Sequence, residues 1–139
     1  MVSRVLVPMD DSEMADAALE FALSAFPSAA VTVLHVAGGP TSYMGEAMSL
    51  AVADDVDAAV ADRAEPVFER ARAIAADAER SITTEIELGS PAKTIIDHAA
   101  GFDLVVLGSH SSSLASRLLL GNVAETVARD APVPVTIVR

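Results

Sequence analysis

The stretch Leu104-Val105-Val106-Leu107-Gly108-Ser109-His110-Ser111 decides the fold of this chain, because an uninterrupted apolar run gives way at a glycine to a polar loop. Such a run is typical of a strand covered on both faces of a parallel sheet. The loop leads to Gly121 and Asn122, where Asn122 and Glu125 resemble a capping box that opens a short helix. Glycines let backbone N–H groups approach an anion, and a helix start adds unpaired donors. Strand, loop and helix together predict a phosphate-binding site.

Strand-like runs alternate with helical patterns along the rest of the chain. The predicted strands cover residues 5–7, 31–36, 82–88, 102–107 and 135–138. The predicted helices have their apolar faces within residues 15–26, 56–75, 95–99 and 123–128. Asp10-Asp11-Ser12 is expected to cap the first helix, and Ser90-Pro91 combines an N-cap serine with a proline at the first helical position. The alternation predicts an α/β fold: one open five-stranded parallel sheet with helices on both faces, Rossmann-type, in a single domain over residues 1–139.

The composition excludes several kinds of partner. Twenty acidic against nine basic residues give a net charge of −11, which repels nucleic acid and anionic lipid. The chain holds no cysteine, and we find no apolar run long enough to cross a bilayer and no secretory segment, so we expect a cytoplasmic protein. Lys93 is the only lysine, and the acidic excess is typical of a halophilic protein, in which salt screens self-repulsion.

The ends of two strands suggest where a ligand binds. In open parallel sheets, ligands lie beyond the carboxyl ends of the strands where the strand order reverses. Asp10 follows the first strand and Gly108 follows the fourth, so if these strands are neighbours, a carboxylate able to hold ribose hydroxyls faces the phosphate loop. This pairing predicts a nucleotide. Helix capping by Asp10 and Asp11 explains the same residues without a ligand, and both interpretations stay open.

These residues resemble the universal stress protein family, and the resemblance covers essentially the whole chain. Members open with a strand that runs into an Asp-x-Ser turn, matched by Val5-Leu6-Val7-Pro8-Met9-Asp10-Asp11-Ser12, and close with a strand, glycine loop, helix and strand, like residues 104–138. The nucleotide-binding members carry Gly, two residues, Gly, nine residues and then Gly-Ser or Gly-Thr. Gly108 and Gly121 fill the outer positions, whereas Ser111 replaces the middle glycine and Asn122 the hydroxyl residue.

The resemblance implies binding of ATP, or of ADP or AMP, on an adenine nucleotide alpha hydrolase-like fold. It implies that Asp10 contacts ribose and that the backbone at Pro8 and Val36 borders adenine. The residues implied around the phosphates are Gly108, Ser111, Gly121, Asn122 and Val123. Ser111 adds a Cβ where glycine is freer, but its hydroxyl can donate to phosphate, and Asn122 can both cap the helix and donate through its amide.

The sequence gives no sign of a metal site or of catalysis by its own residues. His35, His98 and His110 are dispersed without metal-ligand spacing, so we expect Mg²⁺ or Mn²⁺ only through bound phosphate. Ser109 and His110 stand outside any Gly-x-Ser-x-Gly elbow, and no Walker loop supports a phosphotransferase or adenylating enzyme. No catalytic residue is predicted.

Two functions from different classes remain. The first is a regulatory or stress-response module that binds nucleotide, with slow or no hydrolysis. The alternative is a family member without nucleotide that acts as a dimeric interaction protein. Pro132 and Pro134 flank the last strand, which suits a sheet edge, and its apolar residues need cover from another copy. We therefore expect a homodimer through Val135–Val138.

Overall fold

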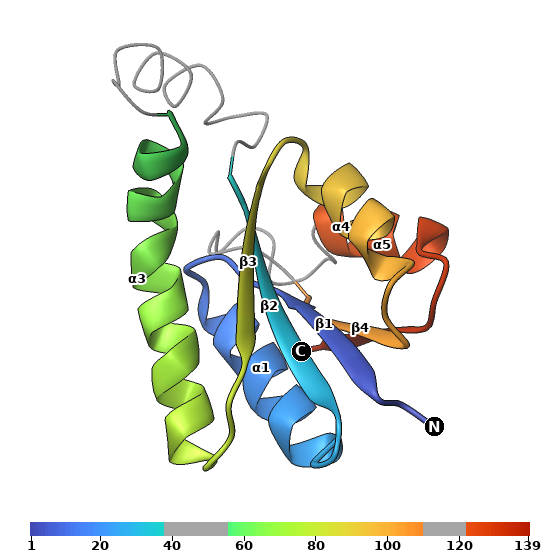
Figure 1. The fold of residues 1–139 in the computed structure, drawn as a ribbon. Helices are drawn as coiled ribbons and strands as arrows, with labels where there is room; N and C mark the ends of the chain where they lie inside the picture. The colour runs from blue at the N-terminus through green and yellow to red at the C-terminus, as the bar shows by residue number, and fades with distance from the viewer. Residues whose placement is uncertain (38–55, 110–121) are drawn as a thin grey trace.

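The computed structural model describes residues 1–37, 56–109 and 122–139. Strands and helices alternate along the chain, as the sequence predicts (Figure 1). In chain order the elements are β1 (Arg4–Pro8), α1 (Glu13–Ala25), β2 (Ala30–Ala37), α3 (Val56–Asp77), β3 (Thr83–Leu88), α4 (Pro91–Ala99), β4 (Leu104–Gly108), α5 (Asn122–Asp130) and β5 (Val135–Val138). None of the described helices combines the length and apolar character needed to span a membrane.

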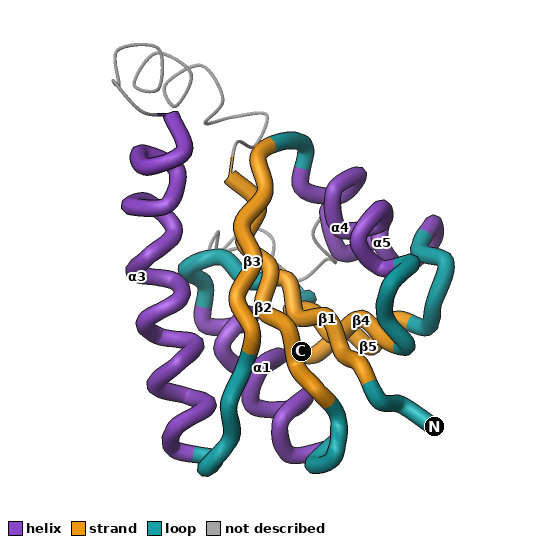
Figure 2. Tube along the Cα trace, viewed as in Figure 1, coloured by secondary structure: helices purple, strands orange, loops and turns teal. Residues whose placement is uncertain are grey.

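The five strands form one sheet in the order β3-β2-β1-β4-β5, and every neighbouring pair is parallel. In the register, Leu6 of β1 lies opposite Thr32 of β2 on one side and Val105 of β4 on the other. The chain moves outward from β1 to β3 and then returns across the sheet to β4 (Figure 2). The strand order therefore reverses between β1 and β4, and the expectation that these strands are neighbours is confirmed.

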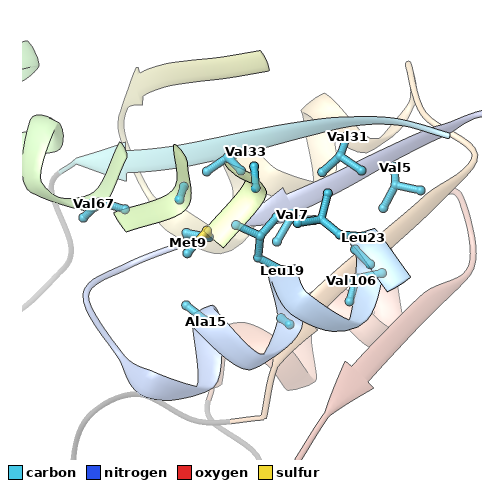
Figure 3. Close-up of a cluster of buried hydrophobic side chains, with 14 of the residues drawn as sticks. Val5, Val7, Met9, Ala15, Leu19, Leu23, Val31, Val33, Val67 and Val106 are labelled. Atoms are coloured by element: carbon cyan, nitrogen blue, oxygen red, sulfur yellow. The ribbon is translucent and has the colours of Figure 1, made fainter. Parts of the chain in front are cut away.

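Each face of the sheet carries its own apolar core. On one face, side chains of the strands pack against α1 and α3, as Figure 3 shows for Val5, Val7 and Val33 beside Leu19 and Val67. On the opposite face a second cluster joins the strands to α4 and α5; its buried members are Leu6, Leu34, Ile95, Ala99, Phe102, Val105, Leu107, Ala124 and Val127. The central strands β1 and β4 are buried on both faces, which explains their uninterrupted apolar runs.

Helix α1 begins where the sequence predicts and for a local reason. Ser12 is the N-cap residue, and its Oγ accepts a hydrogen bond from the Ala15 amide at 3.2 Å. Glu13 and Asp16 add negative charge to the first turn, where the helix dipole favours it. Phe26, expected on the apolar face, packs half-buried against the core and is the C-cap residue of the helix.

Helices α4 and α5 each differ from expectation at one residue. Ser90 occupies the N-cap position of α4, with Pro91 following, but its side chain makes no capping hydrogen bond. Gly89, just before it, takes a φ of 151°, which favours glycine, and its amide donates to the Ala37 carbonyl at 3.0 Å, joining the end of β3 to β2. In α5, Ala128 is exposed rather than on the buried face, because the core side of this short helix is already filled by Ala124 and Val127.

Candidate functional site

The chain leaves β1 and β4 toward opposite faces of the sheet. After β1 it leads to α1, whose apolar face belongs to the core shared with α3, whereas after β4 it leads to α5, in the core shared with α4 (Figure 1). Neighbouring parallel strands with diverging connections leave a crevice at their carboxyl ends, which is where open α/β sheets bind ligands. Asp10 follows β1, and Gly108 and Asn122 end β4 and begin α5. The predicted residues therefore flank one place in the fold.

The turn after β1 is tied down by the neighbouring strand β2. The Met9 amide donates to the Leu34 carbonyl at 2.8 Å, and Met9 itself is buried. The Nδ1 atom of His35 lies 3.0 Å from the Met9 carbonyl oxygen and donates there when it carries the ring proton. The His35 ring meets Phe68 of α3 edge-on, with centroids 6.4 Å apart. His35 therefore has a structural place that fixes the residue before Asp10.

Asp10 is exposed at the tip of this turn and uses one carboxylate oxygen for the turn itself. Its Oδ1 accepts a hydrogen bond from the Ser12 amide at 2.9 Å. No hydrogen bond joins its Oδ2 to any residue in the ranges 1–37, 56–109 and 122–139. Asp10 thus stabilises the turn that leads into the Ser12 cap of α1.

Gly108 has a packing role that the sequence analysis missed. A Cβ built on Gly108 lies 2.8 Å from the backbone carbon and oxygen of Met14, in the first turn of α1. Glycine is therefore required for α1 to lie across the end of β4. The next residue, Ser109, is buried, and its amide donates to the Val138 carbonyl at 2.9 Å, joining β4 to β5.

The remaining predicted site residues differ in their exposure to solvent. Pro8 and Val36 are half-buried at the ends of β1 and β2, and Val123 is half-buried in the first turn of α5. Val36 and Val123 pack against the same apolar cluster, on the α4 and α5 face, while Asn122 is exposed as the first residue of α5. Ser111 and Gly121 lie outside the described residues.

An arginine contact reaches the turn after β1 from a distant helix. Arg70 of α3 donates from Nη1 to the Asp11 carbonyl at 2.9 Å, and its Nη2 forms an ion pair with Asp16 of α1. Arg70 and Asp11 are 59 residues apart in the chain. No local pattern in the sequence reports such a contact.

Other features of the described residues lie away from this edge. A groove of about 480 Å³ separates the C-terminal ends of α1 and α3, where Arg80 donates to the Leu23 and Ala29 carbonyls at 2.8 and 2.6 Å. The Nε2 atom of His98, on α4, lies 3.4 Å from Oε2 of Glu85 and 3.6 Å from Oε1 of Glu87, both on β3. Within the part of the chain that the structure describes, no three acidic or histidine side chains gather in a way that could hold a metal ion.

The strand order and the diverging loops define an open α/β protein of the Rossmann type, with its candidate site at the reversal point. Residues 1–139 match the model of the Universal stress protein family. The chain belongs to this family, and the resemblance inferred from the sequence is confirmed.

Known proteins resemble this one over nearly their full length. The stress response protein NhaX of Bacillus subtilis is 28% identical over 162 aligned residues, covering 98% of this chain and 97% of NhaX. The solved structure of UspA from Lactobacillus plantarum is 29% identical with a TM-score of 0.77, covering 99% and 98% of the two chains. The hypothetical protein MJ0577 is 26% identical with a TM-score of 0.80, covering 99% and 96%.

Two more distant structures hold adenine nucleotides. One is a universal stress protein in complex with cAMP, 24% identical with a TM-score of 0.69, covering 99% of this chain and 97% of the other. The second is a universal stress protein from Archaeoglobus fulgidus in complex with dAMP, 19% identical with a TM-score of 0.69, covering 100% and 98%. At these identities the likeness to the present chain is one of fold.

Proposed function

We propose that this universal stress protein binds ATP or a related adenine nucleotide at the carboxyl ends of β1 and β4. It acts as a regulatory or stress-response module with slow or no hydrolysis. The observation that carries the proposal is the divergence of the two loops at the reversal point, with Asp10 on one side and the start of α5 on the other. The cAMP and dAMP complexes of two proteins with the same fold support an adenine nucleotide.

The described residues fit the parts of such a ligand. The Oδ2 atom of Asp10 accepts a hydrogen bond from a ribose hydroxyl, while Oδ1 stays on the Ser12 amide. The first turn of α5 offers the backbone N–H groups of Asn122 and Val123 to phosphate, with the partial positive charge of a helix start. Pro8 and Val36 supply a half-buried apolar border for adenine. Ser111 and Gly121 complete the phosphate loop, and Mg²⁺ or Mn²⁺ joins through phosphate oxygens.

Calorimetric titration of ATP, ADP and AMP in molar KCl tests the proposal. The wild type is expected to release or absorb heat with at least one of the three. Asp10→Asn keeps the Oδ1 acceptor for the Ser12 amide but loses the charge, so it should bind about tenfold more weakly. Glu13→Gln is the matched control: it removes one charge from the adjoining first turn of α1 without touching Asp10, and should bind as the wild type does.

Two outcomes of this titration separate the competing functions. If the wild type gives no heat with any of the three nucleotides, the non-nucleotide interaction protein replaces this proposal. If steady turnover of ATP well above the buffer rate accompanies binding, the protein is an enzyme rather than a binding module. Gly121→Val, which places a bulky side chain in the glycine motif, is expected to abolish the heat.

We also propose a homodimer through β5. This strand pairs only with β4 within the described sheet, and all four of its residues are half-buried in the single chain. An edge strand with apolar residues is covered in native proteins, and a second copy of the same strand is a suitable cover. Light scattering should give twice the 14.3 kDa mass of one chain. A monomer mass at micromolar concentration contradicts this assembly.

A further inference from the structure

One guanidinium joins three segments around the turn that carries Asp10. Arg70, on α3, donates to the Asp11 carbonyl at 2.9 Å and pairs with the Asp16 carboxylate in the first turn of α1. The contact partners lie 59 and 54 residues from Arg70 in the chain. The long helix α3 is thereby connected directly to the tip of the β1–α1 turn.

Asp10 sits between two anchors. On its N-terminal side, Met9 is held by β2 through the Leu34 carbonyl and the His35 ring. On its C-terminal side, the peptide group of Asp11 is held by Arg70. The Asp10 side chain is itself exposed, and its one hydrogen bond to the described part of the chain is local, to the Ser12 amide. Its direction therefore depends on the backbone on either side, and Arg70 fixes one of those two sides.

The chemistry of this anchor favours arginine over lysine. A guanidinium presents its donors in a rigid planar fork, so one group can serve a carbonyl and a carboxylate together, whereas a lysine ammonium is a single point charge. Asp16 is only 24% exposed, and its Oδ1 is buried without a hydrogen-bond partner among the described residues. Arg70 is therefore the group that compensates this half-buried carboxylate, which keeps the guanidinium in place beside Asp11.

We infer that Arg70 is a positioning residue for ribose recognition: it holds the turn so that Asp10 Oδ2 meets the ribose hydroxyls. This inference rests on the proposed nucleotide function. It predicts that Arg70 affects the part of the affinity that comes from the ribose hydroxyls, and that it does so without touching the ligand.

The test compares ATP with 2′,3′-dideoxy-ATP, which lacks the hydroxyls that Asp10 would bind. The wild type should prefer ATP by roughly tenfold or more, as expected for hydrogen bonds to a charged group. In Arg70→Gln the preference should fall to within about threefold, because Asp10 is no longer held. The ratio of the two affinities is the readout, since a partly unfolded sample weakens both nucleotides equally and leaves their ratio unchanged.

Arg72→Gln is the matched control. Arg72 stands on the same helix, pairs with exposed Glu65 and lies 5.9 Å from the centroid of the Phe68 ring. Among the described residues it makes no hydrogen bond to Asp11 or Asp16, so this variant should keep the wild-type ratio. Arg70→Lys retains the charge without the fork and should give an intermediate ratio; it also replaces Arg70→Gln if that variant does not fold.

The outcomes separate the two proposals. A wild-type ratio retained in both Arg70 variants overturns the positioning role while nucleotide binding stands. Equal binding of the two nucleotides by the wild type also overturns it, because Asp10 then does not read the ribose. No binding of either nucleotide by the wild type overturns the proposed function and this inference with it.

Discussion

Gly108, at the end of β4, and Met14, in the first turn of α1, meet without space for a side chain between them. A Cβ on Gly108 stands only 2.8 Å from the Met14 carbonyl carbon and oxygen. The first glycine of the nucleotide motif is therefore needed to seat α1 on the sheet, whatever it contributes to phosphate. The same contact fixes the helix that follows Asp10, so packing and the candidate site share one residue.

Gly108→Ala should destabilise the protein by about 1–3 kcal/mol, because α1 must move away from β4 to admit the methyl group. Urea denaturation measures the free energy of unfolding. Gly101→Ala is the control, since its Cβ meets only ordinary contacts, 3.8 Å from the His98 carbonyl and 4.0 Å from Arg4. Equal stability of Gly108→Ala and the wild type would show that the contact relaxes freely.

Glu79 adopts a left-handed backbone conformation, with a φ of 56°, just after α3. The amides of Glu79 and Arg80 close the helix end by donating to the Ala76 and Ala75 carbonyls at 3.0 and 2.8 Å. Glycine takes this conformation without the clash of a Cβ, so Glu79→Gly should raise the melting temperature through a gain of about 1 kcal/mol. Glu79→Ala keeps the Cβ and should gain nothing; an equal gain would assign the effect to the lost charge.

Asp103 links the start of β4 to the chain before β1. Its Oδ2 accepts hydrogen bonds from the Ser3 amide at 3.0 Å, the Ser3 hydroxyl at 2.9 Å and the Arg4 amide at 2.9 Å. These bonds, the Ser3 amide first, lower the pKa of Asp103 below its ordinary value of 3.8. A lowered folded-state pKa gives stability that is present above 3.8 and is lost as the pH falls through the folded-state pKa.

Asp103→Asn should therefore melt at a lower temperature than the wild type at neutral pH, and the difference should close in the acid range below 3.8. Thermal melts followed by circular dichroism across this pH range measure it. A difference that stays constant from neutral pH into the acid range would mean that the charge of Asp103 is not what the hydrogen bonds stabilise.

The charge balance predicts that folding depends on salt. With a net charge of −11, the acidic side chains of the folded chain repel one another. Glu85 and Glu87, for example, both lie within 3.6 Å of the same histidine nitrogen, Nε2 of His98. The free energy of unfolding should fall on moving from molar to millimolar KCl, as screening weakens. NaCl at equal ionic strength should protect as well as KCl. A protein indifferent to both salts would exclude adaptation to a high-salt cytoplasm.

The fold was predictable from local patterns because its central strands are covered on both faces. Burial on two faces leaves uninterrupted apolar runs at residues 5–7 of β1 and 104–107 of β4, and such runs are read directly from the sequence. The Ser12 cap was predictable because an N-cap depends on residues three apart. At Ser90 the same pattern predicted the N-cap position but not the hydrogen bond, because the serine side chain makes no capping contact there.

The residues that support the candidate site were not predictable from the sequence. The alternation of elements predicted a parallel sheet but left the strand order open, and it is the order found in the structure that brings Asp10 and Gly108 to one edge of the sheet. The contacts of Gly108 with Met14 and of Arg70 with Asp11 join residues far apart in the chain, and no spacing or composition reports them. Such long-range contacts arise from packing, so they emerge only once the elements are placed.

A crystal structure of the protein grown with saturating ATP tests the central claim most directly. We expect the nucleotide at the carboxyl ends of β1 and β4, with a ribose hydroxyl within hydrogen-bonding distance of Asp10 Oδ2 and the phosphates at the first turn of α5. A nucleotide bound elsewhere, or this edge filled by the protein's own side chains despite saturating ATP, would contradict it.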